Sequence, residues 1–164
     1  MTALTEKVFL AMMEYDRGDA GRIQHFTKVY EYASLIGKAE KLEPYAQETL
    51  EIAAICHDIG IKLCLKKYGK CPGNLQELEG PPEAEKLLEG CGVPKAQADR
   101  VCFLIGHHHT YEGVDGIDWR IILEADFLVN GYEGKCSEDA ILKAGDSFYR
   151  TGGGKKLLSL MFGI

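Results

Sequence analysis

Three kinds of feature are missing from this chain of 164 residues. No uncharged apolar run is long enough to cross a bilayer, which excludes a membrane span. No dense block of lysine and arginine occurs and the formal net charge is -6, which argues against binding to a nucleic-acid polymer. The first residues, MTALTEKVFLAMMEYDRGDA, lack the basic start, apolar stretch and cleavage site of a signal peptide. We therefore predict a cytoplasmic protein.

The cysteines also lack a pattern. The chain has six of them, and no two are separated by the two residues of a C-x-x-C motif. This spacing excludes a zinc ribbon and a thioredoxin-type redox site. Cys56 and Cys102 lie inside apolar runs with helical spacing, so we predict reduced, partly buried thiols.

Hydrophobic residues make up 46% of the chain and charged residues 27%, which is typical of a globular domain. Apolar side chains recur at spacings of three and four residues, which predicts helices rather than strands. We expect one all-α domain over residues 1–164, a compact helical bundle whose C-terminal helices at 137–162 pack on a core. The expected helices cover about residues 4–17, 22–37, 45–58, 82–90, 95–107, 118–130, 137–149 and 155–162.

Two stretches interrupt the helical pattern. Residues 59–80 contain Gly60, Gly69, Pro72-Gly73 and Gly80, with Pro81 and Pro82 directly after them, and residues 110–117 read TYEGVDGI. A loop as long as the first is more often functional than a plain connection. We therefore predict that both stretches are loops and that they shape a substrate pocket.

Two polar residues lie in apolar surroundings. Asp126 lies in the most apolar expected helix, with Ile122 and Val129 one turn away on the same face. An ionised carboxylate there costs several kcal/mol unless it is paired or bound to a metal. His25 lies between Ile23 and Phe26 and faces a similar apolar stripe.

The remaining histidines occur at helix ends. His57 is followed at once by Asp58 in AAICHDIGI, and residues 107–109 form a histidine run in FLIGHHHTYEGVDG. Taken singly, each is more often a hydrogen-bonded core residue than a ligand. Together with His25 and Asp126 they place nitrogen and oxygen ligands on four separate helices, which is how helix bundles build metal sites. Such ligands suit Mn, Fe, Co, Ni or Zn, and we expect one or two divalent ions.

The order of these residues resembles that of the HD-domain superfamily of metal-dependent phosphohydrolases. The superfamily pattern is His, then His-Asp, then Asp, which corresponds here to His25, His57-Asp58 and Asp126. The string HDIG matches a common variant, and the resemblance covers about residues 22–130. The strings EGPPEAEKLLEGCG, LIGHHHTYEGVDG and EADFLVN are similar to a small bacterial branch. The resemblance implies a helical bundle with a central metal held by these four residues.

The resemblance also implies a second metal site. In dinuclear members one ligand is a histidine in the pattern His-Gly-Pro-x-x-Ala, and Glu79 occupies that position here. An Ile-x-x-His spacing selects His108 as another ligand, with His107 and His109 as alternates. Asp58 would bridge the two ions.

Lysines that follow the HDIG string are candidates for binding a substrate phosphate. Many members carry a lysine directly after HDIG, whereas here Lys62 stands one position later. We expect Lys62, Lys66 or Lys67 to neutralise a substrate phosphate, or else to be solvated surface charges. The catalytic residues implied are Asp58, Glu79 and Lys62.

The implied activity is hydrolysis, by metal-bound water, of a phosphoester in a nucleotide or other small phosphorylated metabolite. Two alternatives are a dinuclear-iron redox enzyme that uses oxygen and a non-catalytic sensor that binds a nucleotide. Tyr68, Tyr111 and Trp119 are candidates either for stacking on a base or for packing. The apolar tail LLSLMFGI is a candidate either for core packing or for a homodimer contact.

Overall fold

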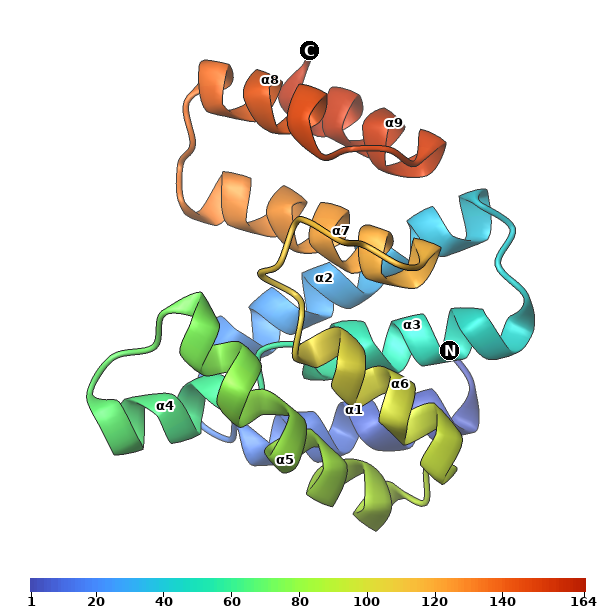
Figure 1. Cartoon of the computed structure of the whole chain (residues 1–164), viewed down its shortest axis with the longest axis vertical. Helices are drawn as coiled ribbons and strands as arrows, with labels where there is room; N and C mark the ends of the chain where they lie inside the picture. The colour runs from blue at the N-terminus through green and yellow to red at the C-terminus, as the bar shows by residue number, and fades with distance from the viewer.

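Nine α-helices and no β-strand make up the chain in its computed structural model, which describes residues 1–164 (Figure 1). The prediction of an all-α bundle is therefore confirmed. The helices are α1 (Ala3–Tyr15), α2 (Ala20–Ala39), α3 (Pro44–Cys56), α4 (Gly60–Tyr68), α5 (Gly73–Cys91), α6 (Lys95–Ile105), α7 (Ile117–Glu133), α8 (Glu138–Ser147) and α9 (Gly152–Phe162). No helix is long and apolar enough to cross a membrane.

Local sequence explains where many helices begin and end. The side chains of Thr2, Asp19, Ser137 and Thr151 each accept a hydrogen bond from the backbone N–H three residues later. Such caps satisfy N–H groups that have no partner within the helix. Helix α5 ends at Gly92, whose φ of 77° is a left-handed conformation that glycine adopts without strain.

The prediction of a loop over residues 59–80 is wrong, because α4 and the first part of α5 occupy most of that stretch. Pro81 and Pro82 lie inside α5, although proline removes a helical hydrogen bond. Tertiary packing overrides this local cost. A Cβ atom added at Gly60 would lie 2.8 Å from the backbone nitrogen of Gly80, so two glycines let α4 and α5 meet backbone to backbone. The expected loop at 110–117 contains no helix before Ile117 and is confirmed.

One hydrophobic cluster of 32 buried residues joins the helices. Helix α3 runs through its middle, and every residue from Thr49 to Cys56 is buried. Helix α7 is also central and is buried continuously from Ile121 to Asp126. Figure 1 shows α2 lying beside α3 and α7. A polar residue at the end of α3 or in the middle of α7 is therefore placed near the centre of the molecule.

The C-terminal pair α8 and α9 packs on α7, at the top of Figure 1. The buried carboxylate of Glu124 on α7 accepts hydrogen bonds from the backbone N–H groups of Arg150 and Thr151 and from the Thr151 hydroxyl. Tyr149 donates its hydroxyl to the carbonyl oxygen of Glu124 at 2.7 Å. In the apolar tail, Leu158 is buried in the core and Leu160 is 71% exposed, so a homodimer contact stays a prediction.

Candidate metal centre

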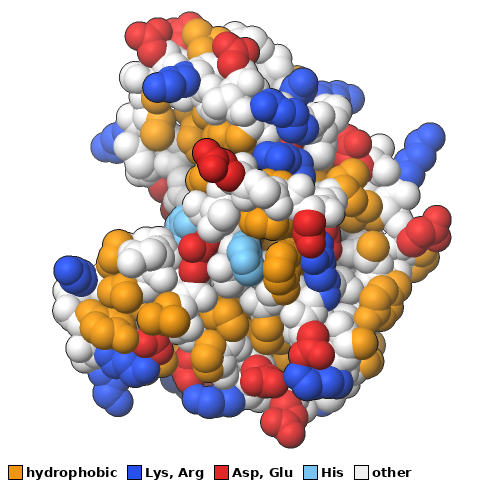
Figure 2. Space-filling model, viewed as in Figure 1, with side chains coloured by type: hydrophobic (Ala, Val, Ile, Leu, Met, Phe, Trp, Pro, Cys, Tyr) orange, Lys and Arg blue, Asp and Glu red, His pale blue; other side chains and the backbone are white.

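Polar residues from α2, α5 and α7, and from the segments that follow α3 and α6, line one hollow of about 460 Å³. We call it the histidine pocket, and its walls include His25, Asp58, Gln76, His109, Asp126 and Glu133. His25 comes from α2, Asp58 follows the end of α3, and Asp126 lies in the middle of α7. Histidine side chains (pale blue) reach the surface in the middle of the face shown in Figure 2, next to acidic groups (red).

The outer nitrogen of each of three histidine rings is held by an acceptor. Nδ1 of His57 lies 2.8 Å from the carbonyl oxygen of Ala54, and Nδ1 of His108 lies 2.6 Å from that of Ile105. Nδ1 of His25 lies 2.8 Å from a carboxylate oxygen of Glu133. These oxygens can only accept, so each Nδ1 carries the proton and each Nε2 turns a lone pair inward in the neutral ring. Metal-binding histidines are oriented in this way by their outer partners.

The inward-facing atoms are spaced as ligands of one ion. Nε2 of His25 lies 3.3 Å from Nε2 of His57 and 3.3 Å from Oδ1 of Asp126. Three further contacts join the histidines to the two acids: His25 to Asp58 at 3.5 Å, His57 to Asp58 at 3.6 Å, and His57 to Asp126 at 3.5 Å. Ligands about 2.0–2.1 Å from a zinc-sized ion stand about 3.3 Å apart in a tetrahedral shell.

The burial of Asp126 supports the same interpretation. Its Oδ1 atom is buried and accepts no well-aligned hydrogen bond, which is costly for a carboxylate oxygen. Two neutral imidazoles with lone pairs 3.3 Å apart also repel each other unless a proton or a metal ion lies between them. The donor set of His25, His57, Asp58 and Asp126 therefore fits a divalent transition metal.

A second group shares Asp58 with the first. Oδ2 of Asp58 faces His25 and His57, whereas Oδ1 lies 3.5 Å from Nε2 of His108. Asp58, His108 and His109 place their ligand atoms within 4.8 Å of one another. The Asp58 carboxylate thus stands between two groups that could each hold an ion.

The electrostatics of the metal-free protein match this geometry. Burial by itself lowers the pKa of a histidine, but the negative charges of Asp58 and Asp126 raise the pKa of His57 to about 9. Burial raises the pKa of a carboxyl group, but the charges of His57 and His108 lower the pKa of Asp58 to about 2. The pKa of Asp126 also lies well below its usual range. The acidic pair therefore attracts positive charge, whether as protons or as metal.

The structure does not bring Glu79 to either group. Its carboxylate instead accepts hydrogen bonds from the amine of Lys67 and the hydroxyl of Tyr68, both at 2.6 Å, which ties α5 to α4. Gln76, one turn earlier on α5, faces the site, and its side-chain oxygen lies 2.9 Å from Nε2 of His109. Gln76, one turn earlier along α5, thus stands where the sequence pattern suggested Glu79.

Two other candidate residues also lie outside the pocket lining. Lys62 donates its amine to the carbonyl oxygen of Tyr15, and that amine lies 5.0 Å from the centre of the Tyr15 ring. His107 holds Nδ1 against the carbonyl oxygen of Phe103 and packs its ring between Phe103 and Trp119. Of the histidine run, His108 and His109 face Asp58.

Sequence reasoning missed several residues that line the histidine pocket, among them Asp19, Arg22, Gln76, Asn130 and Glu133. Arg22 lies three residues before His25, and Asn130 and Glu133 lie four and seven residues after Asp126. Residues at these helical spacings share a face, so the signal was present once the ligands had been chosen.

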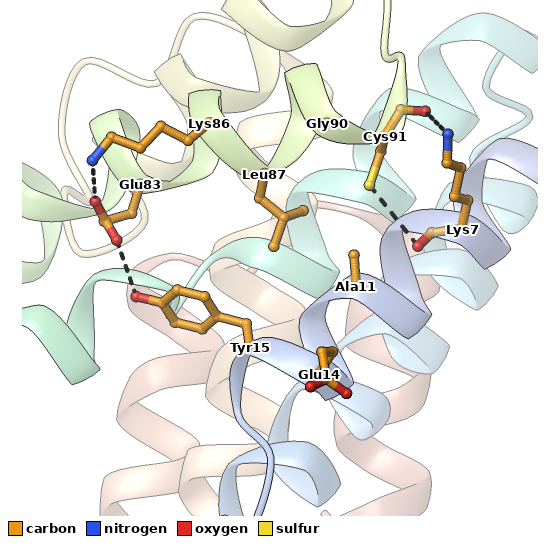
Figure 3. Close-up of a pocket in the computed structure, with 9 residues that line it drawn as sticks. All are labelled: Lys7, Ala11, Glu14, Tyr15, Glu83, Lys86, Leu87, Gly90 and Cys91. Atoms are coloured by element: carbon orange, nitrogen blue, oxygen red, sulfur yellow. Dashed lines mark hydrogen bonds and ion pairs between the residues drawn. The ribbon is translucent and has the colours of Figure 1, made fainter.

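A larger hollow of about 600 Å³ lies between α1 and α5 (Figure 3). We call it the α1–α5 groove, and the residues labelled in Figure 3 define it. Most of its polar groups are paired with one another: Lys86 with Glu83 at 2.6 Å, Tyr15 with Glu83 at 3.3 Å, and Lys7 with the carbonyl oxygen of Cys91 at 2.8 Å. It contains no converging lone pairs and no candidate metal ligand set.

The histidine pocket is thus the candidate functional site, on the geometry of its own residues. Comparisons of the chain with protein-family models, with curated proteins and with solved structures found no match.

Proposed function

We propose that this protein is a metal-dependent phosphohydrolase that acts on a small phosphoester. The observation that carries the proposal is the convergence of His25, His57, Asp58 and Asp126 at the spacing of ligands around one ion, in an open pocket. The order of these residues along the chain resembles that of HD-domain phosphohydrolases and supports the same assignment.

The side chains of the pocket have separate tasks in this proposal. A divalent ion bound there would polarise a phosphoryl oxygen and lower the pKa of a water molecule beside it. The protons on Nδ1 of His25 and His57 fix the ring orientation before the metal arrives. Asp58 and Asp126 neutralise positive charge and leave the open side of the pocket to substrate. Hydrolysis joins the water oxygen to phosphorus and breaks the bond between phosphorus and the ester oxygen. The ester oxygen takes a proton that comes from the water, so the products are phosphate and an alcohol.

Two measurements test the proposal. Mass spectrometry of the purified protein should find about one or two transition-metal ions per chain. The protein loaded with Mn²⁺ or Co²⁺ should release phosphate from at least one member of a panel of phosphoesters. A chain that stays metal-free, and that no divalent ion stabilises to heat, would contradict the metal site. Metal binding without any turnover would favour the nucleotide-binding sensor.

A dinuclear redox enzyme is the second candidate function. The observation that favours it is the second group of Asp58, His108 and His109, because oxygen chemistry in dinuclear sites needs two complete ligand sets. We expect two irons per chain and a visible absorption band that changes with oxygen if this candidate is right. One ion per chain and an enzyme indifferent to oxygen would exclude it.

A further inference from the structure

The lining of the histidine pocket carries information about the substrate. Of the residues that line it, Ile61 is the one hydrophobic side chain, and the rest are glycine, polar or charged. A nucleobase is bound by stacking on aromatic or apolar side chains. No Phe, Tyr or Trp side chain lines the pocket to offer such a platform.

The aromatic residues suggested for base stacking are occupied elsewhere. Trp119 is buried and donates its indole N–H to the carbonyl oxygen of His107 at 2.9 Å. Tyr111 packs edge-on against Phe148, with ring centres 4.8 Å apart, and Tyr68 donates its hydroxyl to an acid on α5. None of the three lines the histidine pocket.

One cation lines the pocket and keeps donors free. Arg22 lies one turn before His25 on α2, and its ion pair with Asp19 uses Nε at 3.4 Å. Its two terminal nitrogens therefore remain available. Lys62 and Lys67, in contrast, are bonded to other groups. The planar guanidinium of arginine binds two phosphate oxygens at once, which suits Arg22 to hold the substrate phosphate beside the metal ligands.

Two further groups in the lining suit hydroxyls. Asn130 lies one turn after Asp126, is exposed in the pocket, and its side chain forms no hydrogen bond within the protein. Its amide can donate to one hydroxyl and accept from another. The exposed carboxylate of Asp19 adds an acceptor. A lining of amides and carboxylates around a single cation matches a polyhydroxylated molecule with one phosphate.

We infer that the substrate is a phosphorylated sugar or polyol and not a nucleotide, with its phosphate on Arg22 and its hydroxyls on Asn130 and Asp19. The inference rests on the proposed function, because it assigns the substrate class of the same site. It goes further in that it selects one class of phosphoester from the lining of the pocket.

A matched pair of substrates tests the class. Ribose 5-phosphate and adenosine 5′-monophosphate share a phosphorylated ribose, and only the second carries a base. With the Mn²⁺-loaded full chain, we expect kcat/KM to be at least about tenfold higher for ribose 5-phosphate, because a site built to hydrogen-bond hydroxyls leaves a base unsupported. Equal or better turnover of the nucleotide would overturn the inference.

A third substrate distinguishes an error in the substrate class from an error in the proposed function. Hydrolysis of p-nitrophenyl phosphate requires only the metal and phosphate chemistry. If it is hydrolysed while the nucleotide is preferred over ribose 5-phosphate, the substrate class is wrong and the proposed function stands. If none of the three is hydrolysed with any metal, the proposed function fails and the inference fails with it.

Binding by calorimetry supplies a readout that is independent of turnover. We expect Arg22→Gln to weaken binding of both inorganic phosphate and ribose 5-phosphate by about tenfold or more, because it removes charge-assisted hydrogen bonds. Asn130→Ala should weaken ribose 5-phosphate alone. The control Arg17→Gln changes an exposed arginine on the neighbouring turn and should alter neither affinity. If Arg22→Gln and Asn130→Ala both bind these ligands as the unmodified protein does, the assignment is wrong.

Discussion

The two hollows of this protein differ in a way that size does not capture. The α1–α5 groove is the larger, at about 600 Å³ against about 460 Å³ for the histidine pocket, and its floor is more apolar. Most of the polar groups in the groove nevertheless form hydrogen bonds with one another. In the histidine pocket, lone pairs from separate helices face one another and a carboxylate oxygen is buried without a hydrogen bond. Convergent ligand atoms therefore single out the histidine pocket as the candidate metal centre, whereas volume alone would select the α1–α5 groove.

The largest effect is expected from removing the buried acid. Asp126→Ala takes away a carboxylate oxygen that contacts both His25 and His57. We expect almost complete loss of bound metal and at least about a hundredfold loss of hydrolysis, because losing a ligand must cost more than the 10–100-fold seen for outer partners. Metal analysis and phosphate release measure this, and circular dichroism checks the fold.

The matched control lies in the α1–α5 groove. Glu14→Ala removes an acid whose side chain is 65% exposed and should leave metal content unchanged. If both variants lose metal equally, the contrast between the two hollows is false.

The pH dependence of metal binding should be the next largest effect. In the metal-free protein the pKa of His57 is raised from 6.5 to about 9, so below pH 9 a metal ion must displace its proton. Affinity should rise at least about tenfold per pH unit, or at least about a hundredfold from pH 6 to pH 8, because nearby acids also raise the pKa of His25. Calorimetric titrations at these pH values measure it, and a flat profile would contradict displacement of a proton.

The raised pKa of His57 also predicts how the stability of the metal-free protein depends on pH. Protonation of His57 stabilises the folded state because its pKa is raised on folding. This contribution to the free energy of unfolding is complete below the unfolded-state pKa of 6.5 and is lost as pH rises through about 9. The lowered pKa of Asp58 stabilises above its ordinary value of 3.8, and that contribution is lost as pH falls towards 2. Urea unfolding at pH 6 and pH 9 should show the metal-free chain weaker at pH 9, and excess metal should remove the difference.

An intermediate effect is expected from the acid behind His25. Glu133 accepts the Nδ1 proton of His25 and also pairs with Lys28 at 2.6 Å. Glu133→Gln keeps the shape but removes the charge, and should weaken metal binding by about tenfold. Glu83→Gln makes the same change in the α1–α5 groove and should leave metal affinity unaltered. Similar losses in both would show that the effect is not specific to the histidine pocket.

The smallest effect concerns the α1–α5 groove itself. A Cβ atom added at Gly90 would meet nothing within 4 Å. Gly90→Ala should therefore stabilise α5 by about 0.5–1 kcal/mol, because alanine loses less backbone entropy in a helix. Urea unfolding measures the gain, while metal content and hydrolysis should stay within twofold. A clear fall in activity would mean that the groove takes part in function.

Helices α4 and α5 differ from what their sequence predicts. Glycine and proline in residues 59–80 obey local rules that predict a loop, yet the helix forms because Gly60 and Gly80 permit close packing of α4 on α5. The same helix decides that Gln76, and not Glu79, faces the histidines. A sequence pattern assigns a position along the chain, but the packing of α5 decides which of its turns faces the histidines.

Local periodicity and chemistry determined much of this protein from the sequence alone. Spacings of three and four residues predicted an all-α bundle, and an acid among apolar neighbours predicted that Asp126 is buried. Only the tertiary structure decided which donors meet. His25 lies 32 residues before His57, and Asp126 lies 68 residues after Asp58, so the distances between these side chains depend on how α2, α3 and α7 cross. The free donors of Arg22 and Asn130 likewise became visible only when their neighbours in space were known.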